Sequence, residues 1–279
     1  MSEIVFTFPG KAGDALHQWP VAYHWAKQAG QKFTCWMDER SCKIVAPLFA
    51  AQPCVEKIEF KPGVETYSCG GQPFHFDLDT KEFIGRTVYH LGLRSFPQRQ
   101  LTLHCLADSG VPVKVEPSVL ADEPSLVVNP QEKRNRVILH GQAVCPHTRA
   151  TPGFWKFLYS IRKDLEERFE EIVFVGSERD REVATRTYPQ WQTFDDKGDF
   201  SVLADYMAAS ELVIGVGSSV VVLASLLKVP SIRVHDPISD APKAIWENLQ
   251  RVHMNDTENE LRKLWPAWRD EHFPVKVAV

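Results

Sequence analysis

Residues 3–30 read EIVFTFPGKAGDALHQWPVAYHWAKQAG, in which an apolar run breaks into a glycine turn and then into an amphipathic segment. The run 4–8 consists of Ile, Val, Phe and Thr, which favours a strand. Leu16, Trp19 and Tyr23 then recur at the spacing of one helix face. A strand followed at once by a helix is the repeating unit of a parallel α/β sheet, in which ligands gather at the carboxyl ends of the strands.

One acidic residue, Asp14, stands in the turn between this strand and this helix. Pro9, Gly10 and Gly13 supply the tight turn around it. Two interpretations of that position stay open. Asp14 is either a carboxylate presented at the mouth of a ligand site or a residue that caps the helix N-terminus.

Length, composition and charge limit the classes of protein to which the sequence can belong. The 279 residues suit one large domain or two medium domains, and 44% of them are hydrophobic. The net charge of −4 disfavours a broad polyanion-binding face, although it leaves room for a local basic patch. A nucleic acid partner is therefore disfavoured but still open.

Targeting and cysteine signals are weak. No apolar run approaches the roughly 20 residues that span a bilayer, and no signal segment opens the chain. We therefore expect a cytoplasmic protein without a transmembrane segment, and peripheral contact with the inner membrane face stays open. The six cysteines form no CxxC pair, so we expect buried reduced thiols and no metal site.

Short β-branched runs alternate with amphipathic segments, which predicts parallel sheets with crossover helices. In the first half we expect strands near 4–8, 32–36, 55–60 and 74–79 and helices near 81–91 and 98–109. In the second half we expect strands at 137–140, 172–175, 212–215 and 231–234 and helices at 154–169, 179–187, 200–209, 218–227 and 257–270. The stretch 110–135 between them carries four prolines, as a connector would. The pattern predicts two Rossmann-like domains, 1–125 and 126–255, and a terminal segment, 256–279.

A second strand–turn–helix site lies at 211–234, ELVIGVGSSVVVLASLLKVPSIRV. Gly217, Ser218 and Ser219 stand where the helix begins, and free N–H groups and the helix dipole favour an anion there. Val220 replaces the third glycine of a dinucleotide fingerprint, and no P-loop lysine follows. The alternative is a turn that merely caps a closely packed helix.

Two further turns fall at the same predicted sheet edge. Thr148 and Arg149 lie close to a helix N-terminus, and arginine offers a fork of donors suited to a diphosphate. In the next turn Gly176 and Ser177 precede Glu178, which could bind a ribose or a base. A solvated loop and a charged helix N-terminus are the respective alternatives.

Taken together, these segments resemble the ADP-heptose:lipopolysaccharide heptosyltransferase family, glycosyltransferase family 9. Residues 13–39, beginning GDALHQWP, are similar to the GD-x-x-H-x-x-P segment that opens the family's acceptor domain. FHFDLDTKEFIGR at 74–86 resembles its strand that ends in Asp before a helix. LHGQAVCPHTRATPGFW at 139–155 resembles its donor-diphosphate loop, and 215–234 resembles its D-[ST]-G-x-x-H-x-x-A-A-L-x-x-P segment.

The resemblance implies a GT-B fold, two Rossmann-like domains whose parallel sheets face each other across a cleft, with the terminal segment returning to the first domain. It implies an inverting, metal-independent glycosyltransferase that needs no cofactor and takes a nucleotide-diphosphate sugar as co-substrate. Asp14 would be the base. The residues expected at the acceptor side or in the cleft are Lys11, Gly13, His17, Asp79 and Lys81.

Two departures from the family pattern bear on the donor. Gly217 stands where the family has Asp, and Val222 stands where it has His. These changes point to a nucleotide sugar other than ADP-heptose, or to a donor site rebuilt from Ser218 and Ser219.

Other functions stay open on the same fold. They are a noncatalytic nucleotide-sugar-binding subunit and a nucleotide-sugar epimerase or hydrolase; a nicotinamide oxidoreductase is disfavoured because neither half carries GxGxxG. The expected acceptor is a hydroxyl on a glycan, a lipid-linked molecule or another compound.

Overall fold

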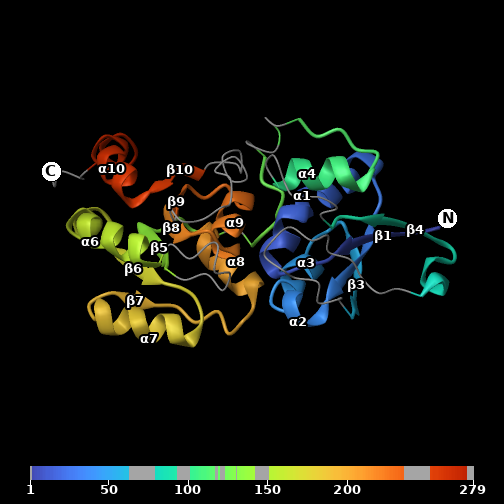
Figure 1. The fold of residues 1–279 in the computed structure, drawn as a ribbon, viewed down its shortest axis with the longest axis horizontal. Helices are drawn as coiled ribbons and strands as arrows, with labels where there is room; N and C mark the ends of the chain where they lie inside the picture. Colours follow the sequence, from blue (N-terminus) through green and yellow to red (C-terminus); the bar gives the residue numbers. More distant parts are fainter. Residues whose placement is uncertain are drawn as a thin grey trace.

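The computed structural model describes residues 2–62, 79–92, 101–116, 119, 123–129, 131–141, 151–235 and 252–274. The described chain forms two parallel sheets, of four and six strands, each with helices packed beside it (Figure 1). The α/β class expected from the sequence is therefore confirmed, with one sheet in each half of the chain.

The first sheet has the strand order β3-β2-β1-β4. Its elements are β1 (Glu3–Phe8), α1 (Ala12–Ala29), β2 (Phe33–Asp38), α2 (Glu39–Cys42), α3 (Ala46–Ala50), β3 (Val55–Lys61), the short 3₁₀ helix η1 (Thr80–Phe83), β4 (Arg86–His90) and α4 (Leu101–Ser109). Aromatic side chains alternate along β1, so Phe6 and Phe8 lie on its apolar face, where Phe8 stacks with Trp19 of α1. That packing holds α1 against the sheet and fixes where its N-terminus lies.

The second sheet has the strand order β10-β9-β8-β5-β6-β7. Its elements are β5 (Arg136–His140), α6 (Thr151–Arg168), β6 (Glu171–Phe174), α7 (Glu178–Thr187), β7 (Gln192–Thr193), α8 (Phe200–Ala208), β8 (Leu212–Val216), α9 (Ser219–Leu226), β9 (Ser231–His235), β10 (Val252–Thr257) and α10 (Glu258–His272). The order reverses between β5 and β8, because the chain first builds outward through β6 and β7 and then through β9 and β10. In such sheets the ligand crevice opens at the reversal, beyond the carboxyl ends of the strands.

The two sheets are joined by a shared apolar core. Helices α1 and α9 contact each other, and one cluster of buried side chains includes Leu16 of α1 and Leu223 of α9. The segment between the sheets contacts both helices. Ser125 accepts a hydrogen bond from Trp19 Nε1 at 2.7 Å and donates its own N–H to Leu226 O at 3.3 Å. The predicted boundary at 125/126 falls in this segment.

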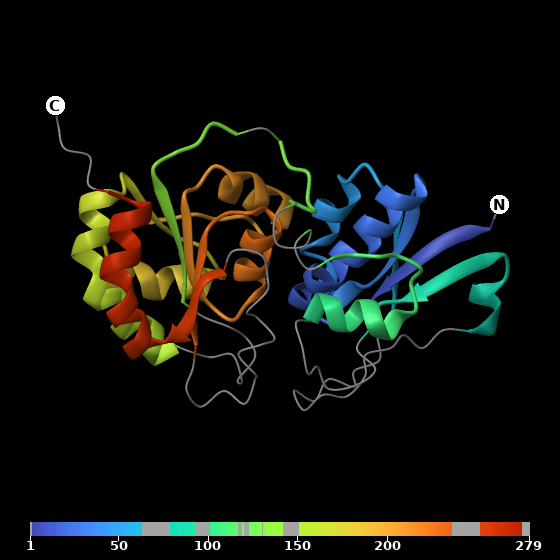
Figure 2. The ribbon, with the colours of Figure 1, turned by 90° about the horizontal axis from the view of Figure 1, so that it is seen from above.

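The terminal helix corrects one expectation. We expected residues 256–279 to return to the first domain, whereas α10 packs on α6, β9 and β10 of the second sheet's unit (Figures 1 and 2). The physical reason is its apolar side: Leu261 and Trp265 are buried in the core cluster of the second sheet. Among the described residues, no helix is long and apolar enough to cross a membrane.

The stretch 81–91 corrects a second expectation. We expected a helix, but the chain forms the short η1 and then β4, which pairs in parallel with β1. Gly85 adopts a left-handed φ of 74° between them, which ends the turn and starts the strand. The expected strand at 74–79 lies outside the described residues except for Asp79, and the short strand β7 and strand β10 had no counterpart in the prediction.

Candidate functional site

Asp14 occupies the first turn of α1, directly beyond the carboxyl end of β1. It is the third residue of the helix, and its Oδ2 accepts a hydrogen bond from the Lys11 N–H at 2.9 Å, closing a capping box. Gly10 makes room for this arrangement, since its φ is 100° and a Cβ there would lie 2.9 Å from Asp14 Oδ2. Asp14 therefore does cap the N-terminus of α1. Because the bond uses Oδ2, the described contacts leave Oδ1 for a ligand.

The surroundings of Asp14 favour a carboxyl group that can exchange a proton near neutral pH. Burial raises its pKa from 3.8 to about 6, although the Lys11 N–H and the Lys11 charge oppose that shift. Two thiols lie close enough to feel its charge. The pKa values of Cys42 and Cys105 are raised, first by burial and then by Asp14.

We predict that Asp14→Asn changes the pH dependence of stability. The pKa of about 6 in the folded state exceeds the ordinary 3.8, so the folded protein binds this proton more tightly and loses stability as pH rises between those values. Relative to the parent, Asp14→Asn should gain up to about 2 kcal/mol of unfolding free energy between pH 4 and pH 7. Urea unfolding at both pH values measures this difference. A difference that does not change with pH would contradict the assignment.

The β8–α9 turn presents a second helix N-terminus. Gly215 lets α9 lie close to β8, because a Cβ there would meet Val221 Cγ2 at 2.9 Å and His140 O at 3.2 Å. Ser218 is the N-cap residue but its side chain makes no capping bond, and its Oγ is buried without a hydrogen-bond partner among the described residues. The first N–H groups of α9 are therefore not satisfied by that hydroxyl.

The two helix N-termini meet. A Cβ placed on Gly13 of α1 would lie 3.7 Å from the N, Cα and Cβ atoms of Ser219, the first residue of α9. The turn that carries Asp14 and the turn that carries Ser218 thus come together where α1 and α9 lie side by side between the sheets (Figures 1 and 2). Two positive dipole ends at one place favour an anionic ligand.

Two buried basic side chains lie beside this junction. His17 stands one turn after Asp14, is 3% exposed, and has its pKa lowered to about 3 by burial and then by the charge of Arg233. Its imidazole is therefore neutral at pH 7. Arg233 comes from β9, is 1% exposed, and has its pKa lowered to about 9 by burial, so it remains a cation.

Arg233 was missed by the sequence analysis. A Cβ on Gly217 would lie 2.9 Å from its Nε and 3.0 Å from its Nη2, so the guanidinium lies directly against the β8–α9 turn. The signal that points to it is Gly217 itself, a glycine where the resembling family has Asp.

The β6–α7 turn lies at the carboxyl end of the strand on the other side of β5. Ser177 and Asp180 form a capping box, and Gly176 adopts a φ of 139° beside it. Glu178 begins α7 and is exposed. Since β6 and β8 both flank β5, this turn and the β8–α9 turn are separated by two strand spacings, about 10 Å. That separation suits a ligand the length of a nucleotide.

The other predicted residues do not join this site. Thr148 and Arg149 lie outside the described residues. Asp79 caps η1, which leads into β4 at the end of the sheet where Arg86 pairs with Glu3, the amino-terminal end of β1. Lys81 belongs to η1, and η1 lies at the end of the first unit remote from the second sheet (Figure 1). We therefore correct the expectation that Asp79 and Lys81 approach the cleft. They precede β4, whereas the site lies beyond the carboxyl ends of the strands.

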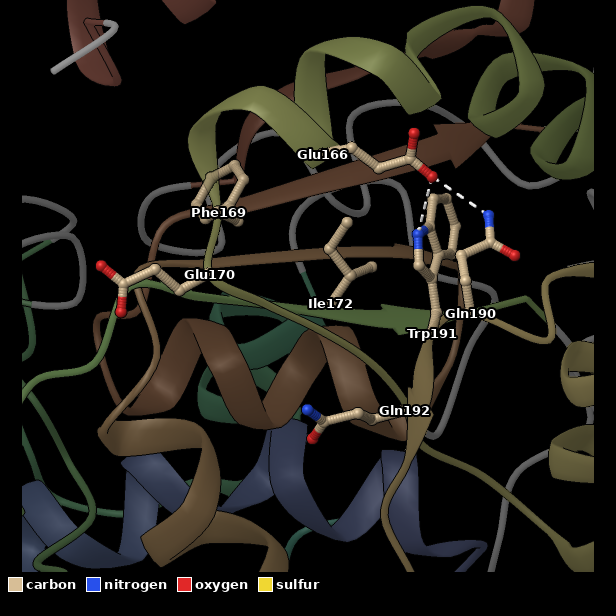
Figure 3. A pocket seen from close by; sticks show the side chains of 7 residues that line it. All are labelled: Glu166, Phe169, Glu170, Ile172, Gln190, Trp191 and Gln192. Atoms are coloured by element: carbon tan, nitrogen blue, oxygen red, sulfur yellow. Dashed lines mark hydrogen bonds between the residues drawn. The ribbon is translucent and has the colours of Figure 1, made fainter. Parts of the chain in front are cut away.

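A pocket of about 230 Å³ lies elsewhere, at the amino-terminal end of β6 (Figure 3). Glu166 closes one side of it by accepting hydrogen bonds from Gln190 Nε2 at 3.1 Å and Trp191 Nε1 at 3.0 Å. Ile172, the second residue of β6, forms the apolar part of its lining together with Phe169 and Trp191. This pocket is therefore on the opposite edge of the second sheet from the Ser218 turn. No group of three His, Cys, Asp or Glu side chains suited to a metal ion occurs within the described ranges.

Comparison with solved structures identifies the fold. The Escherichia coli heptosyltransferase WaaC with ADP is similar over 95% of this chain and 99% of its own, with a TM-score of 0.63 and 12% identity. E. coli ADP-heptose lipopolysaccharide heptosyltransferase II covers 96% and 99%, with a TM-score of 0.60 and 13% identity. A family 9 glycosyltransferase from Veillonella parvula covers 96% and 89%, with a TM-score of 0.62 and 13% identity.

These similarities extend over nearly the whole chain, so the protein has the GT-B fold of the family 9 heptosyltransferases. The sequence matches no protein-family model and no curated protein.

Proposed function

We propose that this protein is an inverting, metal-independent glycosyltransferase that moves a sugar from a nucleotide-diphosphate sugar to an acceptor hydroxyl. The observation that carries the proposal is the junction of α1 and α9. There a carboxyl group with a pKa of about 6 stands beside two helix N-termini that favour an anion. A base and an anion site side by side are what sugar transfer from a diphosphate leaving group requires.

Asp14 takes the proton from the acceptor hydroxyl as that oxygen attacks the anomeric carbon. One bond forms between the acceptor oxygen and the anomeric carbon while the bond from that carbon to the diphosphate oxygen breaks, so the configuration inverts. The negative charge that develops on the diphosphate is stabilised by N–H groups at Ser218 and Ser219 and by the side chains of Arg149 and Thr148. Glu178 binds the ribose or the base.

The acceptor is proposed to enter from the first unit, where Lys11, Gly13 and His17 flank Asp14. His17 is neutral and buried, so it does not compete with Asp14 for the proton of the acceptor hydroxyl. Acceptors on glycans or lipid-linked molecules fit this chemistry, and the resemblance favours work at the cytoplasmic side of a membrane.

One observation favours a noncatalytic alternative. Val222, where the resembling family has His, is 1% exposed in the apolar core, so no polar group reaches a donor from that position.

Incubation with a panel of nucleotide sugars and candidate acceptors separates the functions. Transfer with release of a nucleoside diphosphate supports the proposal; a free epimer, or sugar released to water, supports an epimerase or hydrolase; binding without turnover supports the noncatalytic subunit.

We predict that Arg149→Ala weakens binding of the preferred nucleoside diphosphate by about 1.5–3 kcal/mol, the value of a hydrogen bond to a charged group. Ser218→Ala should cost less, because backbone N–H donors remain at the α9 N-terminus. Calorimetry with ADP, UDP and GDP measures both effects. Equal affinity in the parent and in Arg149→Ala would mean that Arg149 does not contact the diphosphate.

A further inference from the structure

The guanidinium of Arg233 packs against Gly217, in the space that a side chain at 217 would occupy. The guanidinium lies 2.9 Å (Nε) and 3.0 Å (Nη2) from the position that a Cβ at 217 would occupy. Those distances are shorter than side-chain carbons tolerate, so any side chain at 217 would displace Arg233. The family's Asp at this position would therefore require the guanidinium of Arg233 to move from the place that it occupies here.

The location of Arg233 means that glycine in place of Asp at 217 also changes the charge near the β8–α9 turn. On β9, Arg233 pairs in register with Gly215, so it lies just beneath the turn that leads into α9. Its charge also lowers the pKa of His17 on α1, so the guanidinium acts on a residue of the first unit as well as on the β8–α9 turn. An acidic group at 217 would add a negative charge to the turn, whereas Arg233 adds a positive one.

We propose that Gly217 and Arg233 form one paired feature: glycine admits the guanidinium beneath the β8–α9 turn, and this buried cation strengthens binding of the donor's diphosphate above the turn. The inference rests on the proposed function and names a determinant of its donor selectivity. Arg233 acts through the turn and through its charge, so it is a positioning residue. In the low dielectric of the interior, a charge acts on its neighbours more strongly than at the surface.

The first test is a steric cycle that needs no ligand. Gly217→Ala should lower the melting temperature by roughly 2–6 °C in the parent, because the added methyl group meets the guanidinium. In an Arg233→Val background, where that space is empty, Gly217→Ala should have little effect. Equal losses in both backgrounds would overturn the pairing.

The second test measures how affinity depends on ligand charge. In Arg233→Met, calorimetry should show affinity for the preferred nucleoside diphosphate reduced about tenfold or more, with affinity for the uncharged nucleoside nearly unchanged. Arg233→Lys keeps the charge and should restore most of the difference between the two ligands. Inorganic pyrophosphate serves as a probe without a base.

Arg136→Met provides a matched control. Arg136 is also almost fully buried in the second sheet, but it lies at the amino-terminal end of β5 and pairs with Glu171 at 2.6 Å. Its replacement should lower stability and leave the ratio of diphosphate to nucleoside affinity at the parental value. A ratio that falls equally in Arg136→Met and Arg233→Met, or in neither, would overturn the inference. Arg233-dependent diphosphate binding without sugar transfer would instead contradict the proposed function and leave this inference standing.

Discussion

Asp14→Asn should keep the fold and the donor affinity while sugar transfer falls by about 10²–10⁴-fold, the usual contribution of a general base. The amide oxygen can still accept the Lys11 N–H that now bonds to Oδ2, so the capping box survives in part. The amide cannot take a proton from an acceptor hydroxyl. Single-turnover transfer, measured beside calorimetry with the nucleoside diphosphate, separates loss of chemistry from loss of binding.

The chain supplies a matched control for this variant. Asp180 is the third residue of α7, closes a capping box with Ser177, and lies 2.9 Å from where a Cβ of Gly176 would stand, just as Asp14 does beside Gly10. Asp180→Asn should therefore reproduce the structural effect of losing a capping carboxylate without the loss of transfer. Equal activity in the two variants would leave Asp14 as a cap and move the base elsewhere.

The pH profile of the parent gives an independent check. A base must be ionised to act, so kcat/KM should rise with pH through the Asp14 pKa of about 6 and then level off. In Asp14→Asn the residual rate should lose that rise. A parental profile that is flat from pH 5 to pH 8 would argue against a carboxyl group in this environment as the base.

Local signals explain why most of the fold follows from the sequence. The β1–α1 unit has a β-branched run, a glycine turn and a helical repeat in immediate succession, and the structure contains these elements at nearly the predicted residues. The second half is predictable for the same reason: its apolar strands and amphipathic helices alternate with short turns. The helix predicted at 81–91 was wrong because β4 is a strand of five residues at the edge of the described sheet. Its structure depends on pairing with β1, which is far away in the sequence.

The site was predictable where it depends on chain-local geometry and not where it depends on register. Asp14 and Ser218 each follow a strand directly, and the carboxyl ends of parallel strands meet at one edge. Arg233 enters the site only because parallel pairing places it beside Gly215, and no local pattern marks a strand arginine as buried. Asp79 was assigned from a motif whose expected helix is replaced by η1 and a strand, which moves it to the other end of the sheet.

Trp265→Ala should be the most damaging of the structural substitutions considered, with a loss of about 3–5 kcal/mol in unfolding free energy. Trp265 is 2% exposed, packs edge to face on Phe157 of α6 at 6.3 Å, and donates its Nε1–H to Asp164 Oδ2 at 2.8 Å. Removing the indole leaves a cavity beneath α10 and takes one hydrogen bond from Asp164, which keeps its ion pair with Arg269. Because the contacts of Trp265 lie in the second sheet's unit, the loss should be local.

Hydrogen exchange shows whether the loss is local. In Trp265→Ala, amides of α6, α10 and β9 should exchange faster, while those of β1 and β2 keep parental protection. Trp268→Ala is the control, since Trp268 is only partly buried and stacks on His272 at the edge of the same core, so its replacement should cost less and affect α10 mainly. Faster exchange in β1 and β2 would mean that the terminal helix supports the first unit after all. Retained protection in β1 and β2 would show that α10 stabilises the second unit, which contains the sheet that carries the Ser218 turn.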